Sequence, residues 1–338
     1  MKLVPFTILL FLSMLMHSCF EEDQAVPPYI PPDDVETVSI QNSIYTHQIY
    51  FDFSSGLIVA RHENSEWVLA FECLDAGLHI RVNSADLRGL AHTGSTDLSM
   101  DFSSGKGYDW KSDKSDGNPD STAVGKWVSF PGGEALYTNE VMLLGQYDGI
   151  DYTVEKKVQF IHVDELSYKF LVSDPELSSP DTVEVLKNEL LNNVHYSFEN
   201  NELKQLEPPK SDWDILFTQY FTILFTDEGD PAPYYVRGVW QNPYGIESAL
   251  DTIASFADVN ASNALDNDFS LAQDAIGHDW KSVEVDQATN SAEYRVRPGY
   301  TYIVRDKERT LYKFRFTSYF NQSGEKGYPT IEYSLLGN

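Results

Sequence analysis

The sequence is poor in cysteine, in positive charge and in enzyme motifs. Its 338 residues include two cysteines, Cys19 and Cys73, which excludes a disulfide framework. Lys and Arg total 24 against 52 Asp and Glu, and the resulting net charge of −28 argues against nucleic acid as a partner. The chain has no Gly-x-Ser-x-Gly elbow, P-loop or Gly-x-Gly-x-x-Gly segment. We therefore predict a protein that is not an enzyme and that depends on its core for stability, with Cys73 as a small buried hydrophobe.

Residues 1–18 have the pattern of a lipoprotein signal peptide. Lys2 supplies a positive start, and the apolar run Pro5–Met16 is too short to span a bilayer. A small residue, Ser18, comes directly before Cys19, whose thiol we predict to be the lipid-anchor position. The alternative is an ordinary secretory leader in which Cys19 is incidental.

Residues 19–36 form an acidic and proline-rich tether. Glu21-Glu22-Asp23 resembles a surface-export signal, although a merely solvated spacer has the same composition. The pairs Pro27-Pro28 and Pro31-Pro32 favour extended polyproline II. These features predict an outer-membrane lipoprotein exposed at the cell surface, held to the membrane through its lipid alone.

The rest of the chain contains an internal repeat. Four blocks recur in the same order in its two halves: 49–56 and 194–201, 66–71 and 212–217, 107–112 and 277–282, and 166–172 and 310–316. We interpret them as two tandem homologous units, 37–178 and 182–338, joined near Pro180.

The spacing of apolar residues within the blocks indicates strands. Phe51 and Phe53 alternate with polar neighbours, and the stretch 312–316 alternates in the same way, which is the period of a half-buried strand. The best helical candidate is Ile246–Phe256. The sequence thus predicts a mainly β fold made of two tandem antiparallel β modules.

The second half resembles a known family. It contains Ser-Asp-Trp-Asp-Ile-Leu-Phe-Thr at 211–218, Gly-His-Asp-Trp-Lys at 277–281, Phe-Thr-Ser-Tyr at 316–319 and a tail at 324–333. This order resembles the HmuY family of haem-binding surface lipoproteins, and the first half looks like a diverged copy. The resemblance implies an all-β body that grips one haem between extended loops for iron acquisition. It also implies delivery of the haem to an outer-membrane receptor, and two axial His or Met side chains on the iron.

The family's ligand positions hold neither residue type here. The stretch 226–276 has no His and no Met, and 283–286 is Val-Glu-Val-Asp. His278, or Tyr108 at the matching position of the first half, is the alternative iron ligand, unless each simply packs on its neighbours. Three tyrosines in the ligand-bearing region are candidates to stack on a flat ligand or to pack in the fold: Tyr234, Tyr235 and Tyr244. Arg295 and Arg297 are candidates to pair with carboxylates, or else belong to a solvated strand face.

Three functions follow from this sequence. The first is a surface-anchored lipoprotein that captures haem or another porphyrin for an outer-membrane receptor. The second is a structural or interaction lipoprotein that kept the scaffold without the axial ligands. The third is a glycan hydrolase, which would require two carboxylates about 5–9 Å apart in a cleft.

Overall fold

The computed structural model describes residues 34–42, 45–74, 77–226, 228–286 and 291–337, which belong to one compact unit, Asp34–Asn338. The predicted leader, the Cys19 anchor and all but the last residues of the tether lie outside the described residues. Within the described part, helices are too short or too polar to cross a membrane.

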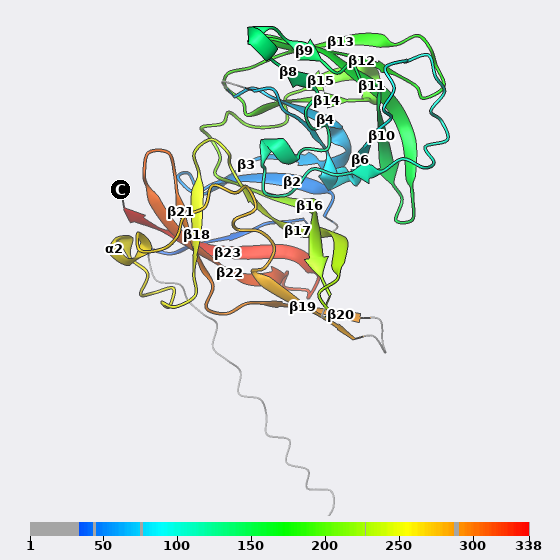
Figure 1. The fold of residues 1–338 in the computed structure, drawn as a ribbon. Helices are drawn as coiled ribbons and strands as arrows, with labels where there is room; N and C mark the ends of the chain where they lie inside the picture. Colours follow the sequence, from blue (N-terminus) through cyan, green and yellow to red (C-terminus); the bar gives the residue numbers. More distant parts are fainter. Residues whose placement is uncertain (1–33, 43–44, 75–76, 227, 287–290, 338) are drawn as a thin grey trace, which may run out of the picture. The chain divides into compact units, whose positions relative to one another are not determined.

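The fold is mainly β, which confirms the predicted class (Figure 1). The strands pair antiparallel in four larger sheets and two small ones. The five-stranded sheet has the order β1 (Glu36–Ser39), β23 (Lys326–Gly337), β22 (Leu311–Phe320), β21 (Thr301–Arg305) and β18 (Glu247–Asp251). The six-stranded sheet has the order β13 (Asp181–Leu186), β12 (Ser167–Ser173), β11 (Tyr152–Val163), β10 (Met142–Tyr147), β6 (Arg88–His92) and β7 (Trp110–Lys111).

The remaining sheets are smaller. One four-stranded sheet has the order β15 (Glu202–Lys204), β14 (Asn193–Ser197), β4 (Leu69–Glu72) and β5 (Ile80–Val82). The other has the order β17 (Pro231–Gln241), β16 (Ile215–Phe225), β2 (His47–Asp52) and β3 (Leu57–Glu63). The two-stranded pairs are β19 (Lys281–Asp286) with β20 (Ser291–Val296), and β8 (Val128–Ser129) with β9 (Leu136–Tyr137).

Helical structure is limited to short turns in the described residues. The α-helix α2 (Ala261–Ala264) is capped by the side chain of Asn260. The 3₁₀ turns are η2 (Asn64–Glu66), η3 (Ser84–Asp86), η4 (Pro119–Ser121), η5 (Pro131–Gly133) and η6 (Glu199–Asn201). The helix predicted over 246–256 is wrong, because this segment contains β18. Pairing of β18 with β21 satisfies its backbone and overrides the local helical spacing.

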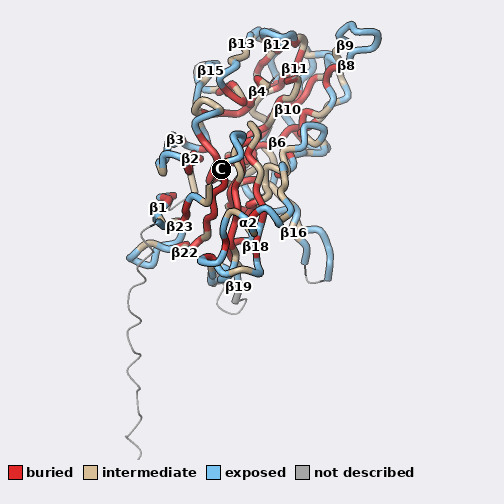
Figure 2. Tube along the Cα trace, turned by 90° about the vertical axis from the view of Figure 1, so that its left-hand side faces the viewer, coloured by how far each residue is buried: buried red, intermediate tan, exposed pale blue. Residues whose placement is uncertain are grey.

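Two hydrophobic cores lie between pairs of sheets, and buried segments run through the interior of the body (Figure 2). The first sandwich packs the six-stranded sheet on β15-β14-β4-β5 around residues such as Phe71 and Phe170. The second packs the five-stranded sheet on β17-β16-β2-β3 around residues such as Phe51 and Phe314. In the second core, Trp280 stacks on Phe316 with ring centroids 3.9 Å apart.

Each sandwich contains strands from both predicted units. Strands β1 to β3 belong to the second sandwich, where β2 pairs with β16, whereas β14 and β15 belong to the first, where β14 pairs with β4. The ranges 37–178 and 182–338 therefore do not form separate sheets, and the tandem arrangement is not confirmed. The common origin of the repeated blocks stays a prediction, although all four block pairs contain strand residues in both halves.

Candidate ligand-binding cleft

An open cleft of about 1040 Å³ lies where the two sandwiches meet. The hairpin of β16 and β17 forms one wall, and the ends of β7, β10 and β11 form the facing wall. The segments around Tyr45, Asn64 and Ala85 complete it. We call it the aromatic cleft because its lining includes seven aromatic side chains: Tyr45, Trp110, Tyr147, Tyr152, Phe221, Tyr234 and Tyr235.

The wall from the first sandwich is a stack of rings. Trp110 lies flat on Tyr152, with ring centroids 4.6 Å apart and planes 12° apart. Tyr147 lies 5.2 Å from Tyr152 on the same wall. Such offset stacks hold their rings in fixed planes, so this wall is a rigid and largely apolar surface.

Two glycines make room for this stack. Gly89 of β6 pairs directly with Gly145 of β10. A Cβ on Gly89 would lie 2.6 Å from the Tyr152 ring, and one on Gly145 would lie 2.6 Å from the Trp110 ring. The rings therefore sit on bare backbone, which only glycine allows at such a close approach.

The facing wall is the β16–β17 hairpin. Its inner part pairs with β2 through Ile215 to Phe217, whereas the rest of β16 pairs with β17 alone. Phe221 is directly opposite Tyr235, and their rings meet edge to face at 5.6 Å. Because opposed residues of antiparallel strands share a face, this pair and the Gln219–Arg237 pair both line the cleft.

The two walls approach each other at Tyr235. Its hydroxyl lies 3.3 Å from that of Tyr152, and its ring lies 6.4 Å from Tyr147. Burial raises the pKa of Tyr235. At the inner end of the cleft the Arg237 guanidinium lies 3.9 Å above the ring of Tyr45.

Of the residues proposed from the sequence as ligand-binding, the structure brings Tyr234 and Tyr235 to the aromatic cleft. The other candidates do not line it. His278 is half-buried, with Nδ1 3.4 Å from the Tyr220 hydroxyl, and burial lowers its pKa. Tyr108 packs beside Phe102 in a separate apolar cluster. Iron ligation by His278 or Tyr108 thus stays a prediction, located away from the cleft.

The remaining candidates make local contacts. Tyr244 lies under two cations, with the Lys307 and Lys210 ammonium groups 3.7 and 4.4 Å from its ring centroid. Arg295 is exposed and forms an ion pair with Glu293, 3.0 Å away on the same strand. Arg297 is exposed near the ring of Tyr300. These contacts are those of a solvated surface, which was the alternative interpretation for both arginines.

Sequence reasoning missed most of the cleft. Trp110 falls in one of the repeated blocks, which is a signal that could have selected it. Tyr147, Tyr152, Phe221 and Arg237 carry no local signal, because long-range strand pairing alone brings them together.

A second cavity, of about 70 Å³, lies between β2, β4, β14, β16 and β17. Four buried polar atoms that line it have no protein partner: Asn192 Oδ1, His195 Nδ1, Trp213 Nε1 and Trp240 Nε1. Leaving such atoms unpaired would cost roughly 1–3 kcal/mol each, and the volume suffices for a few waters that would pair them.

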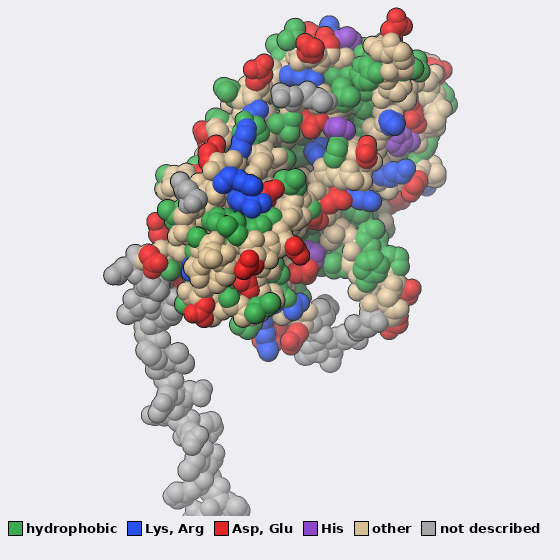
Figure 3. All heavy atoms as spheres, turned by 60° about the vertical axis from the view of Figure 1, so that its left-hand side comes forward, with side chains coloured by type: hydrophobic (Ala, Val, Ile, Leu, Met, Phe, Trp, Pro, Cys, Tyr) green, Lys and Arg blue, Asp and Glu red, His purple; other side chains and the backbone are tan. Residues whose placement is uncertain are grey.

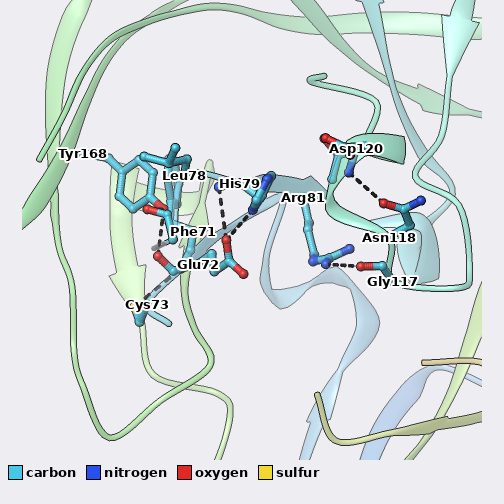
Figure 4. A network of polar contacts seen from close by, with 12 residues as sticks. Phe71, Glu72, Cys73, Leu78, His79, Arg81, Gly117, Asn118, Asp120 and Tyr168 are labelled. Atoms are coloured by element: carbon cyan, nitrogen blue, oxygen red, sulfur yellow. Dashed lines mark hydrogen bonds and ion pairs between the residues drawn. The ribbon is translucent and has the colours of Figure 1, made fainter. Parts of the chain in front are cut away.

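Charged groups at this second cavity have shifted pKa values or local partners. Burial raises the pKa of Glu207 to about 7, although hydrogen bonds from Asn192 and Asn193 oppose the shift. The pKa of His195 falls to about 3 because burial disfavours its charged form. Glu72 forms an ion pair with His79 at 2.5 Å, and Arg81 donates to the carbonyl of Gly117 at 2.8 Å (Figure 4). The Tyr168 hydroxyl donates to the Glu72 carbonyl at 2.7 Å in the same network.

Comparison with known proteins identifies the family. A sequence model described as HmuY protein matches residues 44–333, which is most of the chain. This protein belongs to the HmuY family. The HmuY match is a single one that spans both predicted units. No curated protein matches the chain.

The solved structures that match this HmuY-family chain have low sequence identity to it. The apo HmuY analogue TFO from Tannerella forsythia has 10% identity and a TM-score of 0.31, over 90% of this chain and 96% of its own. A Bacteroides vulgatus protein, described as HmuY-like and haem-binding, has 20% identity and a TM-score of 0.19. The match covers 54% of this chain and 93% of the Bacteroides vulgatus chain. A Bacteroides fragilis protein, described as a lipoprotein, has 15% identity and a TM-score of 0.20. The match covers 57% of this chain and 95% of the Bacteroides fragilis chain.

The lining of the aromatic cleft fits a porphyrin ring, but it does not supply the His or Met side chains that this family uses to ligate the iron. Its walls are stacked rings and its volume matches ligand pockets in general, which favours a flat apolar body. The residues that line it include no His, Met or Cys. The described residues also hold no group of three His, Cys, Asp or Glu side chains placed for a metal ion. The cleft does offer phenolic oxygens, which can ligate ferric haem iron, on Tyr147, Tyr152, Tyr234 and Tyr235, whereas the Tyr45 hydroxyl is already paired with Tyr319.

Proposed function

We propose that this HmuY-family protein binds haem or a related porphyrin in the aromatic cleft. The observation that carries the proposal is the pair of facing aromatic walls, Trp110 on Tyr152 and Phe221 against Tyr235, around an open space of about 1040 Å³. Binding a flat apolar molecule there would add burial and ring stacking, the dominant sources of affinity for such ligands.

The family supports this assignment. Members of the HmuY family bind haem, and the family is one of binding proteins rather than enzymes. The absence of the family's His or Met ligands from the cleft lining changes the expected iron chemistry. The iron would be ligated by a phenolic oxygen, with Tyr235 the best placed because it stands between both walls.

We also propose a location and a partner, which the N-terminal sequence and the family support. The leader and Cys19 support an outer-membrane lipoprotein, and the acidic residues after Cys19 support exposure at the cell surface. A tethered body with an open cleft could release its porphyrin to an outer-membrane receptor. This delivery step is the biological role that we propose.

The test is a titration of hemin into the compact unit, residues 34–338, followed by the Soret band. Saturation near one equivalent with a shifted band supports the proposal, and an unchanged spectrum at micromolar hemin refutes it. Tyr235→Phe separates ring stacking from iron ligation. This variant keeps the ring, so it should change the spectrum of bound hemin more than its affinity.

The lack of His, Met and Cys in the cleft lining favours a second candidate function. In that case the protein is an interaction lipoprotein that kept the scaffold and binds no porphyrin. Titration with iron-free protoporphyrin distinguishes the two, since stacking alone should bind it if the first proposal is correct.

A further inference from the structure

The side chain of Arg237 lacks the partner that its charge requires. The residue lies on β17, opposite Gln219, and lines the aromatic cleft. Its guanidinium carbon is 3.9 Å from the ring centroid of Tyr45, whose own ring stacks on Tyr319 at 6.2 Å. This cation–π contact fixes the plane of the guanidinium and leaves its hydrogen-bond donors free.

Among the described residues, no carboxylate lies within ion-pair distance of Arg237, and its buried Nε has no hydrogen-bond partner. Other half-buried or buried arginines of this acidic chain do have partners. Arg88 pairs with Asp86 and Glu155, and Arg305 pairs with Glu247. Arg81 has no carboxylate partner but donates to the Gly117 carbonyl, so among the buried and half-buried arginines that the structure describes, Arg237 is the one whose side chain has neither an ion pair nor a hydrogen-bonded carbonyl.

The acidic residues that line the same cleft are engaged elsewhere or exposed. Asp86 accepts from Arg88 at 2.9 Å, and Asp148 accepts the backbone N–H groups of its own turn. Glu63 is exposed at the rim. Lys281 lies behind Arg237 and its Nζ donates to the Arg237 carbonyl at 2.6 Å, but burial and the nearby guanidinium lower the pKa of Lys281 to about 7, so Arg237 is the stronger cation of the two at neutral pH. Acidic and basic side chains are both scattered over the face of the body that Figure 3 shows, so the outer surface does not distinguish Arg237, whereas its missing counter-ion does.

We propose that Arg237 binds a carboxylate of the ligand, so that the aromatic cleft selects planar molecules bearing a carboxylate at one edge. This inference rests on the proposed porphyrin function and specifies its recognition. A partly buried guanidinium without a counter-ion is costly, and its planar fork matches a carboxylate with two parallel hydrogen bonds. Tyr45 holds the fork in place while the rings of the two walls hold the flat body of the ligand.

The test compares iron-free protoporphyrin with its dimethyl ester, so that iron ligation plays no part. Affinities are measured by fluorescence for residues 34–338, for Arg237→Gln and for Arg237→Lys. A charge-assisted hydrogen bond predicts that the wild-type protein binds the free acid about tenfold to a hundredfold more tightly than the ester. Arg237→Gln should lose this preference because its affinity for the free acid falls while its affinity for the ester stays unchanged. Arg237→Lys should keep part of the preference.

Arg295→Gln is the matched control, because Arg295 is exposed and paired with Glu293 outside the cleft. It should bind both compounds like the wild-type protein. Equal affinity of the wild-type protein for acid and ester overturns the assignment of Arg237, as does an Arg237→Gln variant that weakens both compounds equally. Failure of the wild-type protein to bind either compound overturns the porphyrin proposal itself.

Discussion

The hydroxyl oxygens of Tyr152 and Tyr235 lie 3.3 Å apart, although the two residues belong to different sandwiches. Tyr152 begins β11 in the six-stranded sheet, and Tyr235 lies on the hairpin that extends from the second sandwich. The aromatic cleft therefore exists only where the two sandwiches meet, and neither range of the sequence could form it alone.

The first prediction concerns the two walls. Tyr152→Leu and Tyr235→Leu should each weaken protoporphyrin binding about threefold to tenfold, because each removes ring stacking worth roughly 0.5–1.5 kcal/mol. Fluorescence titration of the compact unit measures the change. Tyr244→Leu is the control, since Tyr244 lies between two lysines outside the cleft. An equal loss in Tyr244→Leu would show that the effect is not specific to the cleft.

The second prediction concerns the glycine beneath Trp110. Gly145→Ala would place a Cβ 2.6 Å from the Trp110 ring and 2.7 Å from the Thr153 carbonyl oxygen. The ring must move, so we expect a loss of roughly 1–3 kcal/mol in the free energy of unfolding, as for other overpacked sites. Near-ultraviolet circular dichroism should change with it. A variant as stable as the wild-type protein, with an unchanged spectrum, would contradict the packing described here.

The third prediction is a pH dependence at the second cavity. The pKa of Glu207 is 4.5 in a model peptide and about 7 in the fold. Between these values the unfolded chain has lost the proton that the folded protein keeps. The free energy of unfolding therefore falls as the pH rises through this window, by up to about 1.4 kcal/mol per pH unit.

Glu207→Gln removes this contribution. Its stability relative to the wild-type protein should rise between about pH 5 and pH 7, as measured by urea unfolding across that range. His195 is present in both proteins, so its own titration largely cancels. Glu199→Gln is the control, because that side chain is 75% exposed and should give parallel curves. Parallel curves for Glu207→Gln as well would mean that Glu207 is not shifted.

The fourth prediction concerns Cys73. It is buried, it forms no disulfide, and burial raises the pKa of its thiol. A thiol reagent at neutral pH should leave the native compact unit unmodified and react with one thiol after unfolding in guanidinium. Rapid labelling of the native protein would show that the first sandwich opens around β4.

The sequence was sufficient for the fold class and for the burial of Cys73. Alternation of apolar and polar residues around Phe51 and Phe314 is a local property, and both positions lie in strands of the second core. The same local reasoning failed at 246–256, where helical spacing coincides with β18. There the pairing partner β21, more than fifty residues away, decides the conformation.

The pairing of strands could not be predicted in this way. Nothing in the sequence of β2 indicates that it pairs with β16 of the other half as well as with β3 of its own half. The candidate site depends on that pairing. Tyr234 and Tyr235 were identified because they lie in the region where the resembled family carries an iron ligand, whereas Arg237, two residues on, was not. Its significance is the missing counter-ion, which is visible only in three dimensions.

The most direct test of the account is a crystal structure of residues 34–338 with protoporphyrin bound. We predict that the macrocycle lies between the Trp110–Tyr152 stack and the Phe221–Tyr235 pair, with one carboxylate on Arg237. A porphyrin bound beside His278, or anywhere else outside the aromatic cleft, would contradict this account.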